Sequence, residues 1–152
     1  MHKICYVASS GGHLEEILAL EPLGKLYSSV LITEKTSFNL SMWPQKIYSV
    51  SSVDRKDKLL FLKLFWISCV ALFVFIKEKP DIILTTGALI AYPVCLLARF
   101  MKKKIIYIEI LARVYSGSAT GLRIYRFADL FIIQWENLFK IYPNAMYTGR
   151  LA

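Results

Sequence analysis

The chain alternates short apolar runs with segments in which apolar residues recur every three or four positions. The short runs have the length and β-branched content of buried strands, whereas the periodic segments are typical of helices with one apolar face. This pattern predicts strands at residues 3–8, 29–33, 46–50, 82–85, 105–108, 130–133 and 145–148, and helices after residue 14, at 59–76, at 92–101 and at 122–128. Strands that alternate with helices predict an α/β fold with a doubly wound, mainly parallel sheet, and we expect residues 1–152 to form a single domain.

The first predicted strand leads into the sequence Ser9-Ser10-Gly11-Gly12-His13, and a helix follows. Adjacent glycines let the backbone approach a ligand closely, and the first free N–H groups of the helix supply donors for an anion. The histidine could give or take a proton, or hydrogen-bond a phosphate or a hydroxyl. A lone Gly-Gly-His is a weak motif, so a tight turn capped by a histidine remains the alternative.

Two further junctions are predicted at the same edge of the sheet, where parallel strands end. Thr86-Gly87 follows the fourth predicted strand, and Glu109 follows the fifth. Folds of this type place substrate-handling groups at the carboxyl ends of their strands. Glu109 could therefore orient a hydroxyl or act as a base, or it could cap the next turn, which contains Arg113 and Ser116.

Two other segments each have two possible roles. The predicted loop at 34–45 carries Trp43, which could touch a ligand or cover the core. Lys102, Lys103 and Lys104 end the 92–101 helix, where cations complement the helix dipole. These lysines could form a solvated face or could meet lipid phosphate. The sequence leaves both pairs of roles open.

The segment at 59–76 has a single charged residue, Lys63, and is apolar on all sides of a helix. Such a helix is buried in the protein, embedded in a membrane, or both. It would be about 27 Å long, at the short end for crossing a bilayer. A crossing would also split one sheet across the membrane, so we predict a helix at about 57–77 that lies in the interface or dips into it. A buried crossover helix and a true span remain alternatives.

Charges on both sides of this segment indicate its orientation. Arg55, Lys56 and Lys58 precede it, and Lys77 and Lys79 follow it. Because cations favour the cytoplasmic side, we expect both ends at the cytoplasmic face of the plasma membrane, in a peripheral or monotopic arrangement. The side chains predicted to contact the membrane are Lys63, Phe65, Trp66 and Phe73.

Composition agrees with membrane association. Apolar residues make up 56% of the chain, the mean hydropathy is +0.47 and the net charge is +8, which favours anionic partners such as phospholipid headgroups and pyrophosphate-linked substrates. The interleaved basic and aromatic residues of nucleic-acid binders are missing, so no nucleic-acid partner is expected. The three cysteines lie in apolar runs without metal or redox spacing, so we expect buried thiols of a reducing compartment and no metal site. No signal peptide is expected, because the apolar stretch from His2 to Ala8 is too short and leads directly into the glycine turn.

Separated motifs along the whole chain form a combination found in one known family. They are Ser9-Ser10-Gly11-Gly12-His13 with Glu16, Lys79-Pro80-Asp81 to Thr85-Thr86-Gly87, Tyr107-Ile108-Glu109 with Arg113, Gly121 and Asp129, Gln134-Trp135, Tyr142-Pro143 and Tyr147-Thr148-Gly149. Together they resemble the acceptor-side subunit of split glycosyltransferases. In eukaryotes that subunit anchors the N-acetylglucosaminyltransferase that makes the chitobiose lipid carrier of N-glycosylation, and bacterial relatives belong to capsule and exopolysaccharide gene sets. The N-terminal half of the enzyme that forms lipid II is similar, through a glycine loop that ends in Gly-Gly-His.

The resemblance implies an inverting, metal-independent GT-B enzyme with two Rossmann-like domains, of which this chain supplies the N-terminal, acceptor-binding one. A donor-binding catalytic partner would complete the heterodimer and hold the UDP-sugar, so we expect no cofactor on this chain and no activity without the partner. The implied acceptor is a polyprenyl-pyrophosphate-linked sugar. Eukaryotic members carry an N-terminal membrane anchor, and here the 59–76 segment is expected to provide the attachment.

An inverting transfer needs a base within hydrogen-bonding distance of the acceptor hydroxyl. The candidate catalytic residues are His13, whose ordinary pKa suits this task, and Glu109, which could instead orient the hydroxyl. The acceptor cleft is expected to be lined by Ser10, Gly11, Gly12, Thr86, Gly87, Arg113 and Ser116.

Two other functions remain open. A non-catalytic scaffold that only recruits a transferase to the membrane would need the 59–76 helix but not His13. A dinucleotide-binding oxidoreductase domain is suggested by Glu34, which lies 22 residues after Gly12, although the spaced Gly-x-Gly-x-x-Gly motif is missing.

Overall fold

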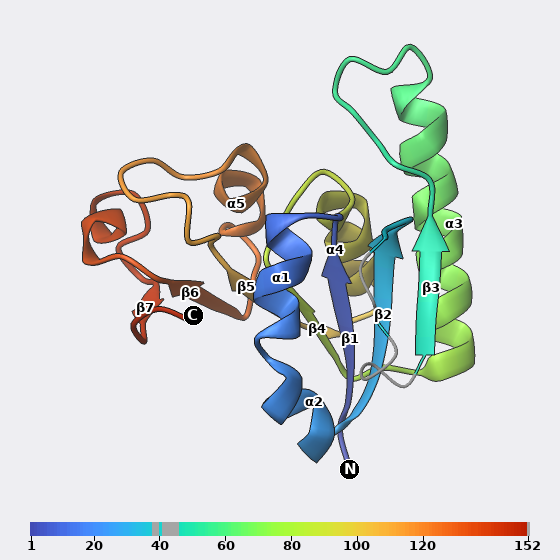
Figure 1. The fold of residues 1–152 in the computed structure, drawn as a ribbon, viewed down its shortest axis with the longest axis horizontal. Helices are drawn as coiled ribbons and strands as arrows, with labels where there is room; N and C mark the ends of the chain where they lie inside the picture. Colours follow the sequence, from blue (N-terminus) through green and yellow to red (C-terminus); the bar gives the residue numbers. More distant parts are fainter. Residues whose placement is uncertain (38–39, 41–45, 152) are drawn as a thin grey trace.

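The computed structural model describes residues 1–37, 40 and 46–151, and shows a seven-stranded sheet between two layers of helices (Figure 1). The strands lie in the order β3-β2-β1-β4-β5-β6-β7, and every neighbouring pair is parallel. The strands are β1 (Lys3–Ala8), β2 (Ser28–Glu34), β3 (Lys46–Val50), β4 (Ile82–Thr85), β5 (Lys104–Ile108), β6 (Leu130–Ile133) and β7 (Met146–Tyr147). The helices are α1 (Gly12–Leu18), α2 (Glu21–Leu26), α3 (Leu60–Glu78), α4 (Ala91–Phe100), α5 (Ala119–Ile124) and a 3₁₀ helix η1 (Glu136–Lys140).

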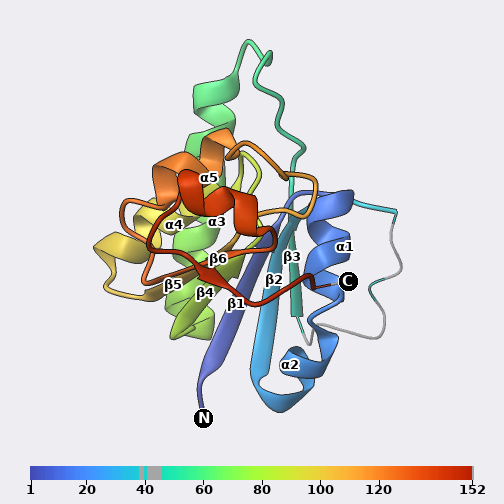
Figure 2. The ribbon, with the colours of Figure 1, turned by 90° about the vertical axis from the view of Figure 1, so that its left-hand side faces the viewer.

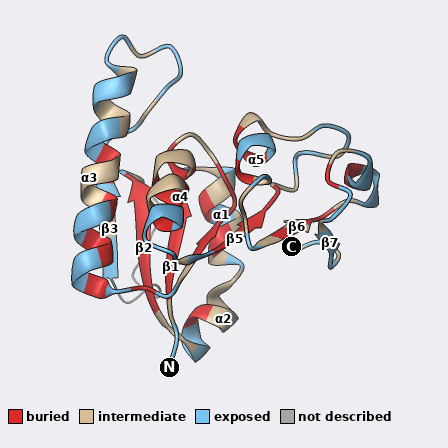
Figure 3. Cartoon of the chain, turned by 180° about the vertical axis from the view of Figure 1, so that it is seen from behind, coloured by how far each residue is buried: buried red, intermediate tan, exposed pale blue. Residues whose placement is uncertain are grey.

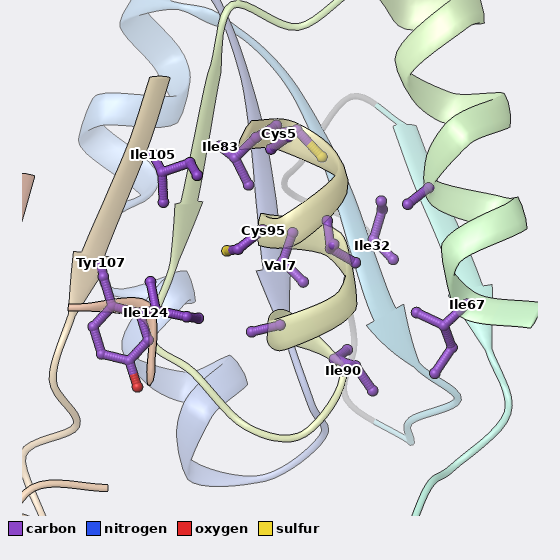
Figure 4. Close-up of a cluster of buried hydrophobic side chains, with 14 of the residues drawn as sticks. Cys5, Val7, Ile32, Ile67, Ile83, Ile90, Cys95, Ile105, Tyr107 and Ile124 are labelled. Carbon is purple, nitrogen blue, oxygen red and sulfur yellow. The ribbon is translucent and has the colours of Figure 1, made fainter. Parts of the chain in front are cut away.

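The two helical layers enclose two separate cores. α1 and α2 lie on one face of the sheet, and α3, α4 and α5 lie on the other (Figures 1 and 2). Because successive strand residues point to opposite faces, each strand feeds both cores. Val7, Ile83 and Ile67 of α3 belong to one cluster of buried side chains (Figure 4), whereas Tyr6 and Leu14 of α1 belong to the other.

The observed sheet confirms the predicted α/β class, and it is parallel at every pairing rather than mainly parallel. The strands at 3–8, 46–50, 82–85 and 130–133 have the predicted bounds. Those at 3–8 and 82–85 are mostly buried apolar runs, which is the composition of strands covered on both faces, whereas the edge strand at 46–50 is largely exposed. Trp43, the predicted ligand or lid residue, lies outside the described residues.

Two helices, α5 and α2, differ most from the prediction. α5 begins at Ala119 rather than at 122, because the Ser118 side chain accepts a hydrogen bond from Gly121 N at 2.9 Å and caps the helix there. α2 is absent from the sequence prediction, because six residues are too few to show a helical period. Its first turn contains a proline, and Lys25 pairs with Glu21 at 2.9 Å across one turn.

The winding of the chain reverses between β1 and β4. β2 and β3 lie on one side of β1, and β4 to β7 lie on the other. β1 and β4 are in register from Ile4 opposite Ile82 to Val7 opposite Thr85, so their carboxyl ends meet at one edge. Open parallel sheets bind ligands in the crevice outside such a reversal. Both predicted glycine turns begin there.

Candidate functional site at the carboxyl edge of the sheet

A buried carboxylate braces the first glycine turn. Glu34, 5% exposed at the end of β2, accepts hydrogen bonds from Ser10 N at 3.3 Å and Ser10 Oγ at 3.4 Å, and its other oxygen accepts one from Val53 N at 3.0 Å. Gly11 has a φ of 88°, which favours glycine, and α1 begins at the exposed Gly12. Glu34 is therefore occupied by the chain's own donors, which disfavours the dinucleotide-binding alternative.

His13 and Thr86 connect the two glycine turns. His13 Nδ1 lies 3.0 Å from the Thr86 carbonyl oxygen, and Thr86 Oγ1 donates to the His13 carbonyl oxygen at 3.0 Å. A carbonyl oxygen only accepts, so Nδ1 carries the proton and Nε2 of the neutral ring carries the lone pair. Within the described part of the chain no partner hydrogen-bonds Nε2.

Burial keeps this imidazole neutral. Desolvation lowers the pKa of His13 below its ordinary value, although the hydrogen bond to Thr86 and the charges of Glu109 and Glu34 act in the opposite direction. The exposed Arg113 guanidinium adds to the lowering. The ring is therefore a neutral proton acceptor near neutral pH, as a general base must be.

Gly87 determines the shape of the second turn. It has a φ of 107°, and its N–H donates to Thr85 Oγ1 at 3.0 Å. A side-chain carbon at this position would collide with the Tyr107 hydroxyl and would lie 3.6 Å from His13 Cε1. Gly87 is buried, and the buried Thr86 hydroxyl is used within the protein. Both residues therefore shape the crevice, and the Gly87 N–H and the Thr86 hydroxyl are bound within the protein.

Glu109 lies in the protein interior and holds the loop between β5 and α5. Its Oε2 accepts from the Tyr142 hydroxyl at 2.7 Å and from Ser118 N at 3.0 Å, and its Oε1 accepts from Ile110 N at 3.3 Å. The side chain is 0% exposed, and a side-chain carbon at Gly121 would collide with it. This geometry agrees with the alternative in which Glu109 caps the turn. A direct catalytic role for Glu109 stays a prediction.

Arg113 and Ser116 lie exposed on this loop and contact each other, with Nη1 3.4 Å from Oγ. An arginine at such a rim can contact an anionic group of a ligand. The structure buries Glu109 near the crevice, places Arg113 and Ser116 at its rim, and brings together Ser10, Gly11, Gly12, His13, Thr86 and Gly87.

A groove of about 490 Å³ opens beside the first glycine turn. One wall comes from the start of α1 and the other from the loop after β5. The exposed Glu15 carboxylate beside an apolar wall suits a sugar, whose hydroxyls donate hydrogen bonds and whose ring faces are apolar. The groove is lined by Gly12, Glu15, Glu16, Ile110, Leu111 and Ala112.

Two polar residues that the sequence analysis did not assign to the site, Glu16 and Gln134, fix the far wall of the groove. Glu16 accepts from Leu111 N at 2.9 Å and from Gln134 Nε2 at 2.8 Å, and burial raises the pKa of its carboxyl. Gln134 Nε2 also donates to the carbonyl oxygen of Glu109 at 3.0 Å, and Gln134 Oε1 accepts from Leu151 N at 2.9 Å. Only their presence among the family motifs could have identified them, because their partners are distant in sequence.

The described residues contain no group of three His, Cys, Asp or Glu side chains placed to hold a metal ion.

α3 presents an apolar face that the other described residues of the chain leave uncovered. One side packs on the protein through Ile67, Ala71 and Val74. Only 22% of an 18-residue stretch of α3 is buried, and the amino end of the helix projects beyond the sheet (Figures 1 and 3). This disfavours a crossover helix buried in the protein and leaves α3 a candidate membrane anchor. The exposed apolar side chains are Phe61, Leu62, Phe65, Trp66, Leu72, Phe73 and Ile76.

The one charge within the predicted apolar segment is paired. Lys63 Nζ donates to Asp57 Oδ2 at 2.8 Å and to the Ser52 carbonyl oxygen at 3.2 Å. The Asp57 side chain also accepts from Asp54 N at 2.9 Å and closes a turn, so the helix begins at Leu60 rather than near 57. An ion pair of this kind makes a lysine compatible with an apolar surface.

Comparisons with known proteins agree with this geometry. A family model described as "Oligosaccharide biosynthesis protein Alg14 like" matches residues 59–151, more than half of the chain. The "UDP-N-acetylglucosamine transferase subunit ALG14" of Homo sapiens is 28% identical over 177 residues, which cover 97% of this chain and 82% of that protein. The subunit of the same name from Yarrowia lipolytica is 41% identical over 81 residues, which cover 49% of this chain and 38% of that protein.

Solved structures share the fold. MurG of Acinetobacter baumannii has a TM-score of 0.74 at 17% identity over 90% of this chain. A glycosyltransferase of Rickettsia africae has a TM-score of 0.72 at 14% identity over 98% of this chain. The chain spans 43% of each of these proteins. The likeness confirms the predicted Rossmann-like fold of GT-B glycosyltransferases.

Proposed function

Because the chain belongs to the Alg14-like family of oligosaccharide biosynthesis proteins, we propose that it is the membrane-associated, acceptor-binding subunit of a two-component glycosyltransferase. A donor-binding partner completes the enzyme as a heterodimer. The acceptor is a polyprenyl-pyrophosphate-linked sugar, and the product is a lipid-linked oligosaccharide or a capsular or extracellular polysaccharide precursor. The relatives' name makes UDP-N-acetylglucosamine the first donor to test.

One observation carries the proposal: a single domain combines a sugar-sized groove at the carboxyl edge of the sheet with an uncovered apolar helix. A lipid-linked sugar needs both features, because its hydrocarbon stays in the bilayer while its sugar must reach a polar site. Peripheral attachment at the cytoplasmic face, with α3 in the interface, satisfies both requirements.

The relatives' name supports the need for a partner, because it describes a subunit of a UDP-N-acetylglucosamine transferase. The described residues of this chain form one sheet. A GT-B enzyme reacts in the cleft between two such domains, so the donor nucleotide belongs to the second domain. We therefore place UDP-sugar binding mainly on the partner and assign no cofactor to this chain.

In the proposed reaction, His13 Nε2 takes the proton of the acceptor hydroxyl as that oxygen attacks the anomeric carbon and UDP leaves. The neutral ring, with Nδ1–H held by Thr86, has the correct tautomer for this step. Glu109 acts through its loop, which carries the groove wall and Arg113. Arg113 at the rim contacts the pyrophosphate.

Binding measurements on the isolated chain in detergent micelles test the proposal. A polyprenyl-pyrophosphate-linked sugar should bind, and Leu111→Trp in the groove wall should weaken that binding at least tenfold. UDP-N-acetylglucosamine should bind weakly or not at all without the partner. Tight donor binding together with no acceptor binding would reverse the assigned roles and refute the proposal.

A further inference from the structure

Cations and exposed apolar side chains gather at the carboxyl end of α4. Phe100 is 85% exposed and Met101 is 36% exposed. Beside them is a hollow of about 330 Å³ that is lined by Arg99, Lys102, Lys103, Lys104, Ile105, Phe127 and Asp129. In the part of the chain that the structure describes, an ion pair is recorded for only one of these cations, between Lys104 and Asp129 at 3.0 Å. The hollow therefore carries surplus positive charge next to an exposed aromatic ring.

This end of α4 lies at the same edge of the sheet as the end of α3 (Figure 3). The two helices pack against each other on the same face of the sheet, and both end at the edge opposite the crevice (Figure 3). Phe73 and Ile76, in the last turns of α3, are 54% and 60% exposed. Lys77 and Lys79 follow them, as Lys102 and Lys103 follow Phe100. Each helix thus ends in exposed apolar residues followed by cations.

Both helices also end on a lysine with left-handed backbone. Lys79 has a φ of 50° and Lys102 a φ of 55°. At the end of α4, Lys103 N donates to Ala98 O at 2.9 Å and Lys102 N donates to Arg99 O at 3.0 Å, which is the hydrogen-bond pattern that usually requires glycine. A lysine there strains the backbone where glycine would not. Complementing the helix dipole does not explain this placement, because a lysine in the last helical turn would serve equally well.

We infer that the carboxyl end of α4 is a second membrane contact, which binds anionic phospholipid headgroups. The inference rests on the proposed attachment through α3 and adds the lipid class to it. Headgroup phosphates meet Arg99, Lys102 and Lys103, and the Phe100 ring enters the interface. Two contacts prevent the domain from rolling about the α3 axis, and so they fix the direction in which the crevice faces.

Flotation with vesicles tests the inference. Wild type should bind vesicles of phosphatidylcholine and phosphatidylglycerol more tightly than vesicles of phosphatidylcholine alone, and added salt should remove the difference. Lys102→Gly with Lys103→Gln should weaken binding to the anionic vesicles by about 30-fold. Each cation near an anionic surface contributes about 1 kcal/mol, and the loss of two corresponds to that factor. Binding to the neutral vesicles should stay unchanged.

The glycine substitution separates lipid binding from folding. Glycine relieves the left-handed strain at residue 102, so the melting temperature of the variant should be equal to or higher than that of wild type. Lys102→Arg keeps the charge and should bind like wild type. Lys35→Gln with Lys140→Gln removes two exposed cations elsewhere and is the matched control.

Two results would overturn the inference: equal binding of wild type to both kinds of vesicle, or an equal loss in the matched control. A failure of the proposed attachment through α3 gives a different result from a failure of this inference. If α3 does not attach the protein, substitutions on its exposed face will leave binding to neutral vesicles intact.

Discussion

His13 and Thr86, 73 positions apart, hold each other by two hydrogen bonds that run in opposite directions. The imidazole Nδ1–H donates to the Thr86 carbonyl, and the Thr86 hydroxyl donates to the His13 carbonyl, each at 3.0 Å. The pair locks the turn after β1 to the turn after β4 and leaves Nε2 as the proton acceptor. The site predictions below depend on this contact.

His13→Ala should lower kcat of the reconstituted enzyme by about 10² to 10⁴, the usual contribution of a general base. Partner binding and vesicle binding should be unchanged, because His13 lies outside α3. His2→Gln, at the other histidine, is the matched control. Full activity of His13→Ala would favour the non-catalytic scaffold.

The pH dependence of kcat/KM should have an acid limb below pH 6.5, since desolvation lowers the pKa of His13 from that ordinary value. Removing a nearby cation raises an imidazole pKa, so Arg113→Gln should move the limb to higher pH. Initial rates across the pH range measure both effects. A limb above pH 6.5 in wild type would contradict the assignment of this base.

Gly87→Ala should destabilise the protein by about 1 to 3 kcal/mol, because the new methyl group collides with the Tyr107 hydroxyl and the backbone is left-handed. Tyr107→Phe removes the hydroxyl. The double variant should therefore be more stable than the sum of the two single effects predicts, and urea unfolding measures this coupling. Strict additivity would show that the collision is relieved in another way.

Glu78 should make stability fall in acid. Hydrogen bonds from Lys3, Tyr48 and Lys46 lower the pKa of its carboxyl from 4.5 to about 2. A lowered folded-state pKa stabilises the protein fully above about pH 4.5, and this contribution is lost as the pH falls toward 2. Glu78→Gln should flatten the free energy of unfolding over this interval, measured by urea titration at a series of pH values. An unchanged slope would assign the acid sensitivity to other carboxyls.

Phe65→Ser, Trp66→Ser and Phe73→Ser together should move the protein from the membrane fraction to the soluble fraction. These side chains are 70%, 60% and 54% exposed, so their loss removes lipid contact with little effect on the core. The matched control replaces Leu26, Tyr115 and Leu122, which are 71%, 81% and 47% exposed on other elements, by serine. Equal redistribution of both variants would contradict attachment through α3.

The sequence predicts the central strands well, because a strand buried on both faces is a run of apolar residues that are adjacent in the chain. Lys3–Ala8 and Ile82–Thr85 form such strands with the expected bounds. The first glycine turn is equally local, because the positive φ of Gly11 depends only on the residue type at that position and on its neighbours in the chain. Such features depend on neighbours in the chain, so single-sequence reasoning reaches them.

The environment of the site depends on distant residues and was not predictable. Nothing near Glu109 in the sequence indicates that the hydroxyl of Tyr142, 33 positions away, donates a hydrogen bond to its carboxylate. The hydrogen bond from Ser10 to Glu34 and the one from Gln134 to Glu16 also join residues that are distant in the sequence. The apolar segment shows its composition but not its packing, so only the structure reveals that one side of α3 is covered and the other is not.

Sugar transfer in vesicles that contain a polyprenyl-pyrophosphate-linked acceptor tests the central claim most directly. The chain is assayed with UDP-N-acetylglucosamine, alone and after co-expression with a donor-binding subunit encoded in the same genome. We expect no product from either subunit alone and steady turnover from the pair. Full turnover by this chain without a partner would contradict the claim that it is the acceptor half of a two-component enzyme.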